Sequence, residues 1–368
     1  MSKSITRLLE LAGLIQQIPA PTFYETERAG FIFNRFLEAG LQDVEIDKAG
    51  NVFARLRSGP KSSSPVSHPV IVSAHLDTVF PAGTELTTRS DEKMVYGPGI
   101  GDNALGLAGL FGLVWLLQEN QVALPYDLWL AANVCEEGLG DLLGMKSVVD
   151  RFGKDVRAYL VLEGMALGHI YHRGLGVRRY RITVQTEGGH SWMDYGRPSA
   201  IHELTQISTQ FTRFEIPRTP RTTLNIGVIS GGTTVNTIAA QASLELDLRS
   251  ENPDALEQLA MKVENVCRQA RKEGVEVEAK VIGVRPAGEI PASHPLVTLA
   301  VSQLRAQGLG SKLAIGSTDA NIPLSRGFPA VTLGLTTGGG AHTLREYINI
   351  EPLNKGMEAL LGVVKGLI

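Results

Sequence analysis

Apolar residues return every three or four positions in two segments near the start of the chain, residues 5–18 and 25–39. This spacing is typical of amphipathic helices that bury one face. Residues 44–56 read as an extended segment, and residues 58–67, which are rich in serine and proline, indicate a surface loop. The sequence therefore predicts two helices and an extended segment in the first part of the chain.

Short apolar runs bounded by polar or glycine residues then recur at residues 69–74, 126–134, 157–162 and 330–335. Runs of this length are typical of strands buried on both faces, in a parallel or mixed sheet covered by helices. We therefore expect an α/β fold with a mixed central sheet flanked by helices.

The pattern changes in the middle of the chain, where strands alternate apolar and polar residues. The predicted elements are strand 178–185, helix 199–214, strands 222–230 and 242–249, helix 254–273 and strand 275–282. This β-α-β-β-α-β order is ferredoxin-like, with one sheet face wet and the other covered by two helices. We predict a separate domain at residues 176–282, inserted into a discontinuous domain of residues 1–175 and 283–368.

The longest apolar stretch, residues 104–117, is shorter than the roughly 20 residues that span a bilayer. Glycines at positions 106, 109 and 112 repeat along it. We interpret it as a buried core helix. The amphipathic start of the chain does not resemble a signal peptide, so no membrane association is expected.

Composition and charge narrow the classes of partner. The chain is 43% hydrophobic and 20% charged, and 35 basic and 38 acidic residues give a net charge of -3. No basic patch predicts nucleic acid or an anionic membrane as a partner, so small molecules or short peptides are expected. Cys135 and Cys267 allow one disulfide at most and no Cys-x-x-Cys metal site, which favours a reducing, cytoplasmic location.

Candidate chemistry begins where the predicted strands end. Residues 69–74 run into His75 and Asp77, a pair that suits a metal-ligating histidine oriented by a carboxylate. The alternative is a histidine that simply pairs with its neighbour. Before the apolar helix, the glycines of residues 97–101 do not have the spacing of a phosphate-binding loop, and they could turn the backbone to deliver Asp102. The alternative for Asp102 is a helix N-cap.

Adjacent carboxylates follow the next two strands. Glu136 and Glu137 come after residues 126–134, and Glu163 ends the run 157–162. Neighbouring anions at the edge of an apolar run repel each other unless a cation is present, although solvated glutamates would not need one. With a cation, one carboxylate could ligate while the other takes a proton from water.

The combination of these strand ends is more informative than any one of them. Ligands of open α/β sheets bind outside the carboxyl ends of the strands, where His75, Glu137 and Glu163 are expected. Histidine and carboxylate ligands suit Zn²⁺ and less strongly Mn²⁺ or Co²⁺. With Asp102 available as a bridge, we predict two divalent ions about 3.5–4 Å apart.

Together these segments make the sequence similar to the M20 metallopeptidase family, which includes peptidase T-like enzymes, glutamate carboxypeptidases, aminoacylases and acetylornithine deacetylases. The resemblance covers nearly the whole chain. It rests on the segments His75-Leu76-Asp77-Thr78-Val79, Gly99-Ile100-Gly101-Asp102-Asn103, Glu136-Glu137-Gly138, Glu163-Gly164, Gly189-His190-Ser191, Gly231-Gly232-Thr233-Thr234-Val235-Asn236, Ser317-Thr318-Asp319-Ala320-Asn321 and Ala341-His342-Thr343.

The resemblance implies a zinc-peptidase-like catalytic domain and assigns roles within it. One metal would be held by His75 and Glu163 and the other by Glu137 and His342, with Asp102 bridging both. Asp77 would orient His75. Glu136 would be the general base, taking a proton from the attacking water and returning it to the leaving amine.

The resemblance also gives the inserted domain a role as a lid that joins two subunits. His190 would reach the active site of the partner subunit and stabilise the oxyanion, which implies a homodimer. Asn236 and Arg249 would contact substrate, Arg249 by binding a carboxylate. Without the resemblance, His190 would be interpreted as a surface histidine and Arg249 equally well as a strand-end ion pair.

The resemblance implies a dinuclear metal-dependent hydrolase that cleaves a peptide or amide bond in a short peptide or an N-acyl amino acid. Within the family, glutamate at position 163 is more typical of carboxypeptidases and deacylases, whereas residues 317–321 are more similar to the peptidase T-like branch. The alternatives are an N-acyl amino acid deacylase and a non-catalytic binding homologue.

Overall fold

The computed structural model describes residues 3–59 and 68–367, so most of the predicted loop 58–67 lies outside the described residues. The chain forms two compact units. Unit 1 combines the residues up to Gly174 with those from Gly288 onward, and unit 2 is Leu175–Ala287. The sequence placed the second boundary at residue 282, but the last strand of unit 2 continues to Arg285.

A mixed sheet forms the centre of unit 1. Among the described residues its order is β1-β2-β6-β3-β7-β17-β8-β15, with β16 also paired to β8. The strands are β1 (Gln42–Ile46), β2 (Val52–Leu56), β3 (Val70–His75), β6 (Leu128–Asn133), β7 (Ala158–Glu163), β8 (His169–Gly174), β15 (Gly288–Glu289), β16 (Lys312–Gly316) and β17 (Ala330–Gly334). The central strands β6, β3, β7 and β17 run parallel, so their carboxyl ends lie at one edge.

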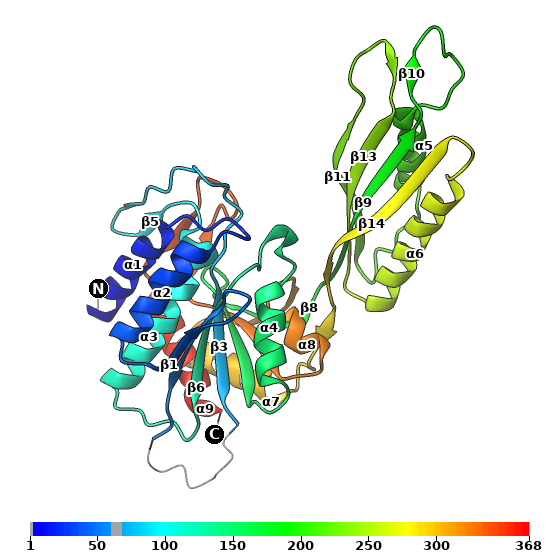
Figure 1. Ribbon diagram of the computed structural model, residues 1–368. Helices are drawn as coiled ribbons and strands as arrows, with labels where there is room; N and C mark the ends of the chain where they lie inside the picture. The colour runs from blue at the N-terminus through cyan, green and yellow to red at the C-terminus, as the bar shows by residue number, and fades with distance from the viewer. Residues whose placement is uncertain (1–2, 60–67, 368) are drawn as a thin grey trace. The chain divides into compact units, whose positions relative to one another are not determined.

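Helices flank this sheet, which confirms the predicted α/β class (Figure 1). They are α1 (Lys3–Gln16), α2 (Thr26–Glu38), α3 (Leu105–Glu119), α4 (Leu143–Phe152), α7 (Pro295–Ala306), α8 (Asn321–Ser325) and α9 (Leu353–Gly366). Figure 1 shows α1, α2 and α3 on one side of β3 and α4 on the other. Phe36 of α2 stacks on Phe111 of α3, with ring centroids 4.9 Å apart.

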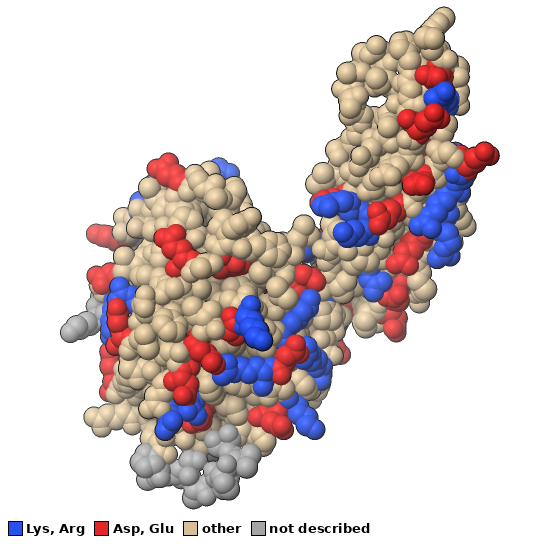
Figure 2. All heavy atoms as spheres, viewed as in Figure 1, with Lys and Arg blue, Asp and Glu red and all other residues tan. Residues whose placement is uncertain are grey.

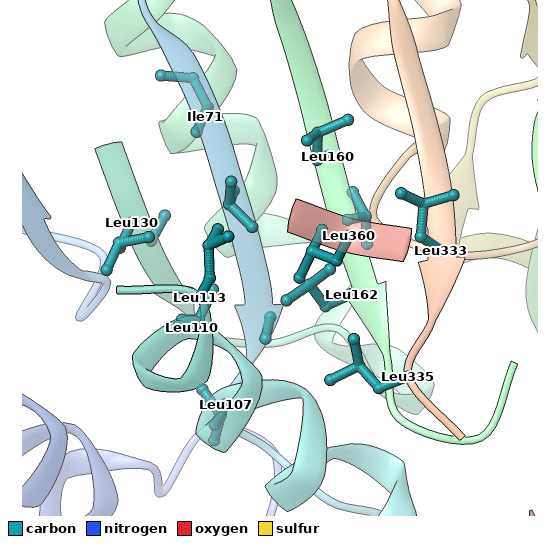
Figure 3. Close-up of a cluster of buried hydrophobic side chains, with 14 of the residues drawn as sticks. Ile71, Leu107, Leu110, Leu113, Leu130, Leu160, Leu162, Leu333, Leu335 and Leu360 are labelled. Atoms are coloured by element: carbon teal, nitrogen blue, oxygen red, sulfur yellow. The ribbon is translucent and has the colours of Figure 1, made fainter. Parts of the chain in front are cut away.

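The apolar helix α3 lies in the core of unit 1. Its Leu107, Leu110 and Leu113 belong to the same buried cluster as Ile71 of β3 and Leu160 of β7 (Figure 3). Each leucine buried in this way contributes about 1.5–3 kcal/mol through the removal of apolar surface from water. A π-helical turn, Ile100–Ala104, precedes α3.

The helical segment Ile100–Glu119 is longer than the predicted run of 104–117. It has 20 residues, and its most apolar 18-residue window has a mean hydropathy of 1.6, so by length and composition it could cross a membrane. However, 89% of its most apolar window is buried inside the fold. This burial is what the sequence predicted for a core helix.

The sequence predicted a single extended segment at residues 44–56. In the structure these residues instead belong to an antiparallel hairpin formed by β1 and β2. The carboxylate of Asp47 accepts hydrogen bonds from the backbone N–H groups of Ala49, Gly50 and Asn51. Gly50 has φ +102°, which other residues rarely adopt. The turn therefore depends on a local side-chain contact that apolar periodicity does not reveal.

Unit 2 is a four-stranded antiparallel sheet covered by two helices. The elements follow the chain as β9 (Gly176–Thr186), α5 (Ala200–Thr212), β11 (Thr222–Gly231), β13 (Gln241–Ser250), α6 (Pro253–Gln269) and β14 (Val275–Arg285). The sheet order is β11-β13-β9-β14. Alternate residues of β13 are buried against a core that includes Leu204 of α5 and Val263 of α6.

Short strands and loops complete the described chain. In unit 1, β4 (Arg89–Ser90), β5 (Met94–Tyr96), β18 (Gly338–Gly339) and β19 (Tyr347–Asn349) form a separate small sheet. In unit 2, β10 (Gly189–His190) pairs with β12 (Thr237–Ile238). Among the described residues, the Asp102–Asn103 and Thr219–Pro220 peptide bonds are cis. On the face drawn in Figure 2, basic and acidic side chains neighbour one another rather than forming a patch of one sign.

Candidate metal centre

Three parallel strands of unit 1 bring chemically active residues to one edge of the sheet. His75 is the last residue of β3 and Glu163 the last of β7, while Glu136 and Glu137 follow the end of β6. Since β3 pairs in parallel with both β6 and β7, these strand ends lie next to one another. This edge is where open α/β sheets bind their ligands.

Asp102 approaches the same edge from the start of the apolar helix. Its φ of -119° and ψ of 82° are not helical, and the residue at the N-cap position is Gly99, so Asp102 is not the N-cap. Its Oδ1 lies 3.1 Å from Nε2 of His75, and its Oδ2 lies 3.1 Å from Nε2 of His342. The two oxygens of one carboxylate therefore face two histidines.

Each histidine also faces a glutamate. Nε2 of His75 lies 3.8 Å from Oε2 of Glu163, and Nε2 of His342 lies 3.3 Å from Oε1 of Glu137. The donor atoms form two groups within 4.8 Å, His75-Asp102-Glu163 and Asp102-Glu137-His342, which share Asp102. The structure thus brings together the five residues that the sequence analysis assigned as metal ligands.

These separations fit divalent cations. Ligand atoms arranged tetrahedrally at about 2.0–2.2 Å from Zn²⁺ are roughly 3.3–3.6 Å from one another. In the two groups the histidine nitrogens lie 3.1–3.8 Å from the carboxylate oxygens, and all the donor atoms of a group lie within 4.8 Å of one another. Histidine nitrogen and carboxylate oxygen are donors that suit Zn²⁺, Co²⁺ and Mn²⁺.

The charges of the ligand residues are also compatible with a divalent cation at this edge. Burial raises the pKa of Glu163 to about 8, although His75 opposes the rise. Hydrogen bonds with Asp102 and Glu137 raise the pKa of His342 to about 10. Burial disfavours the ionised form of Asp102, but His342 and His75 outweigh it and lower the pKa. Protonated histidines thus balance buried carboxylates here, a role that a divalent cation can also perform.

Asp77 is completely buried and connects two parts of the edge. Its Oδ1 lies 3.5 Å from Nδ1 of His75, and its backbone carbonyl lies 3.0 Å from the same nitrogen. The carboxylate accepts hydrogen bonds from the backbone N–H groups of Glu136 at 2.9 Å and Glu137 at 2.8 Å. Asp77 therefore contacts the ring of His75 and also fixes the turn that carries the two glutamates.

Some residues that hold this edge were missed by the sequence analysis. Arg28 of α2 is 1% exposed and donates hydrogen bonds to the carbonyls of Ile18 and Leu76. The side chain of Asn103 donates to the carbonyl of Leu162 and accepts from Gly164, which ties the helix start to the end of β7. A signal existed for Arg28, because this charged residue lies on the apolar stripe of its helix with Ile32 and Phe36.

The remaining predicted site residues lie in unit 2. The backbone N–H of His190 donates to Asp194, and its ring Nδ1 accepts hydrogen bonds from the N–H groups of Trp192 and Met193. The loop of Asn236 lies beside it, since the Asn236 carbonyl accepts from Ser191 at 3.1 Å. His190 and Asn236 therefore belong to neighbouring loops at one end of unit 2.

Arg249 lies elsewhere in unit 2, near the far end of β13. Arg249 lies eight positions after Gln241, where the strand begins, which corresponds to roughly 26 Å of extended chain. Its Nε lies 2.7 Å from Oδ1 of Asp247. Within unit 2, Arg249 therefore forms the ion pair that was its alternative interpretation and does not join His190 and Asn236.

Comparisons with known proteins identify the family and agree with this fold. Residues 71–366 match the model of peptidase family M20/M25/M40, which is most of the chain. The chain therefore belongs to this family of hydrolases, as its sequence motifs predicted.

Three relatives are distant in sequence but match nearly the whole chain. The chain is 23% identical to the uncharacterized protein YqjE of Bacillus subtilis (strain 168), over 98% of each chain. The crystal structure of aminopeptidase PepT from Bacillus cereus ATCC 10987 has a TM-score of 0.79 and 22% identity, covering 99% of this chain and 98% of that one. For the Bacillus subtilis YxeP protein, described as a dinuclear metal-binding peptidase of the M20 family, the TM-score is 0.69 at 18% identity, with 98% of each chain covered. These two structures share the fold.

Proposed function

We propose that the protein is a dinuclear metal-dependent hydrolase that cleaves a peptide or amide bond in a small substrate. The observation that carries the proposal is that two groups of donor atoms share Asp102 at the carboxyl edge of the sheet. Two further points support it: YxeP is described as dinuclear, and PepT as an aminopeptidase. Short peptides and N-acyl amino acids are the substrate classes we propose.

In this proposal His75 and Glu163 hold one ion, Glu137 and His342 hold the other, and Asp102 bridges them. Zn²⁺ is the ion we favour, with Co²⁺ or Mn²⁺ as substitutes, because the donors are nitrogen and carboxylate oxygen. When bound, such ions polarise a carbonyl and make water a better nucleophile near neutral pH. Asp77 orients His75 through Nδ1, which leaves Nε2 for the ion.

Glu136 serves as the general base. It is 5% exposed, and one of its carboxylate oxygens belongs to a group with His75 and Glu137 whose donor atoms lie within 4.8 Å of one another. Its backbone is fixed by the hydrogen bond to Asp77. A carboxylate held there can accept a proton from the attacking water and deliver it to the leaving amine.

His190 supplies a hydrogen-bond donor to the oxyanion. Because its Nδ1 accepts hydrogen bonds from backbone N–H groups, the neutral ring carries its hydrogen on Nε2. We propose that it acts in the site of the partner subunit in a homodimer formed through unit 2. Asn236 would contact substrate beside it. Arg249 pairs with Asp247 away from these two loops of unit 2 and is therefore left out of the proposed substrate contact.

The test compares the metal-loaded wild type with Glu136→Gln on dipeptides, tripeptides and N-acyl amino acids. The variant keeps the shape of the side chain but cannot accept the proton, so kcat should fall by about 10²–10⁴-fold while metal content is unchanged. A wild type that cleaves nothing in the panel would overturn the proposed function. Full activity of Glu136→Gln would overturn only the assignment of the base. Preference for free or acylated amino termini distinguishes a peptidase from a deacylase.

A further inference from the structure

Glu346 is a completely buried carboxylate of unit 1 that the proposed chemistry does not use. It lies four residues after His342, between β18 and β19. Its Oε1 accepts hydrogen bonds from the backbone N–H groups of Gly101 at 2.7 Å and Asp102 at 2.8 Å. Its Oε2 accepts one from Gly99 at 3.0 Å. Three main-chain donors thus converge on one buried anion.

These donors belong to the turn that begins the apolar helix. Buried backbone N–H groups need a hydrogen-bond partner, and Asp102 has non-helical φ and ψ, so regular helical hydrogen bonds do not supply one in this turn. The N-cap residue, Gly99, has no side chain to satisfy them and has φ +77°. A side chain at position 101 would also be crowded, because a Cβ there would lie 2.4 Å from Cγ of Met165. Glu346 therefore caps this turn from a distant part of the chain.

The other end of the contact is the loop of His342. The N–H of Glu346 donates to the carbonyl of Thr343, and the N–H of Thr343 donates to that of Gly340. The carbonyl of Glu346 in turn accepts the N–H of Gly97 at 3.0 Å. Main-chain and side-chain contacts of one residue thus join the His342 loop to the Asp102 turn.

We propose that Glu346 is a positioning residue that fixes Asp102 against His342 and so sets the affinity of the ion that these two residues hold with Glu137. The inference rests on the proposed dinuclear function. The other ion depends on Glu346 less, because His75 and Glu163 are the last residues of paired strands and are positioned by the sheet itself. Glu346 has the same relation to the Asp102 turn as Asp77 has to the turn of Glu136 and Glu137.

The experiment measures metal binding directly, so it does not depend on a known substrate. Apo wild type, Glu346→Gln and Glu346→Ala are titrated with Co²⁺, followed by calorimetry and by the visible absorption of the bound ion. The matched control is Glu203→Gln, which changes a buried carboxylate in α5 of unit 2 that is paired with Lys272. Thermal unfolding of each apo protein reports general damage to the fold.

We expect the wild type and Glu203→Gln to bind two ions with the same affinities. In Glu346→Gln the amide NH₂ replaces one of the accepting oxygens, so the tighter ion should be retained and the second bound 10–100-fold more weakly. Glu346→Ala should also weaken only the second ion, with a larger loss of affinity. If the Ala variant does not fold, the Gln variant alone tests the positioning role of Glu346. With metal below saturation, kcat should fall more than KM rises.

Two results would overturn the inference while leaving the proposed function intact. One is a Glu346→Gln protein that binds both ions as the wild type does. The other is an equal loss of affinity for both ions, which would indicate a general structural role. A wild type that binds fewer than two ions would instead refute the proposed function and the inference with it.

Discussion

The replacement Arg28→Met tests whether a buried arginine stabilises the sheet edge that carries the proposed metal ligands. The guanidinium donates two hydrogen bonds to the carbonyl of Ile18, at 2.6 and 3.0 Å, and one to that of Leu76 at 2.7 Å. Burial lowers the pKa of Arg28 to about 10, opposed by the nearby carboxylates of Asp77 and Glu25, so the side chain is charged at neutral pH. Methionine fills a similar length but neither donates hydrogen bonds nor carries charge.

The expected cost follows from the groups that lose this partner. Two buried carbonyls that lose their donor cost about 1–3 kcal/mol each, or about 2–6 kcal/mol together. Removal of one member of a buried charged group costs about 3–5 kcal/mol, which is consistent with that range. We therefore expect Arg28→Met to lower the free energy of unfolding of unit 1 by about 3–5 kcal/mol. Because the carbonyl of Leu76 lies between His75 and Asp77 in the chain, metal affinity should fall as well.

Urea unfolding of the apo protein measures this loss, with the fluorescence of Trp115 and Trp129 reporting on unit 1. The matched control is Arg35→Met on the same helix, where the arginine is 39% exposed and pairs with Glu38. An exposed pair of this kind contributes under about 1 kcal/mol. A loss of less than about 1 kcal/mol for Arg28→Met would refute the reasoning, because the buried contacts would then contribute no more than exposed ones.

Two further predictions concern packing and charge. In Gly164→Ala the new Cβ would lie 2.3 Å from the carbonyl oxygen of Gly101, so thermal unfolding should show that the free energy of unfolding falls by at least about 2 kcal/mol. The control is Gly13→Ala, whose Cβ meets nothing within 4 Å and which should raise the free energy of unfolding by about 0.5–1 kcal/mol. Equal effects of the two replacements would contradict the close packing at Gly164. In unit 2, burial disfavours the ionised form of Asp247, but Arg249 and Arg179 outweigh it and lower the pKa. Its ionised form therefore stabilises the fold above the ordinary carboxyl pKa of 3.8, and this stabilisation is lost as the pH falls through the lower folded value. Asp247→Asn should be less stable than the wild type by roughly 1 kcal/mol near neutral pH, and the gap should close on acidification in urea titrations; a gap independent of pH would exclude this ion pair as its cause.

Much of the fold could be predicted from the sequence because the relevant signals are local. Apolar runs with a strand-like length identified β3, β6, β7 and β17, and helical spacing identified α1 and α2. Residues that follow parallel buried strands must meet at one edge of the sheet, so the grouping of His75, Glu137 and Glu163 followed from strand order alone. Sequence motifs added Asp102 and His342.

Other features were decided only by tertiary structure. The sequence could not show that Asp102 leaves helical geometry so that its two oxygens face two histidines. Nor could it show which buried charges hold the site: Glu346 contacts Asp102 across 244 positions, and Arg28 contacts Leu76 across 48. Periodicity records which face of an element is buried, but a hydrogen bond between distant segments depends on how the backbone brings single atoms within about 3 Å. The sequence by itself thus determined the strand ends and the kinds of ligand, whereas the tertiary structure decided which side chains hold those ligands in place.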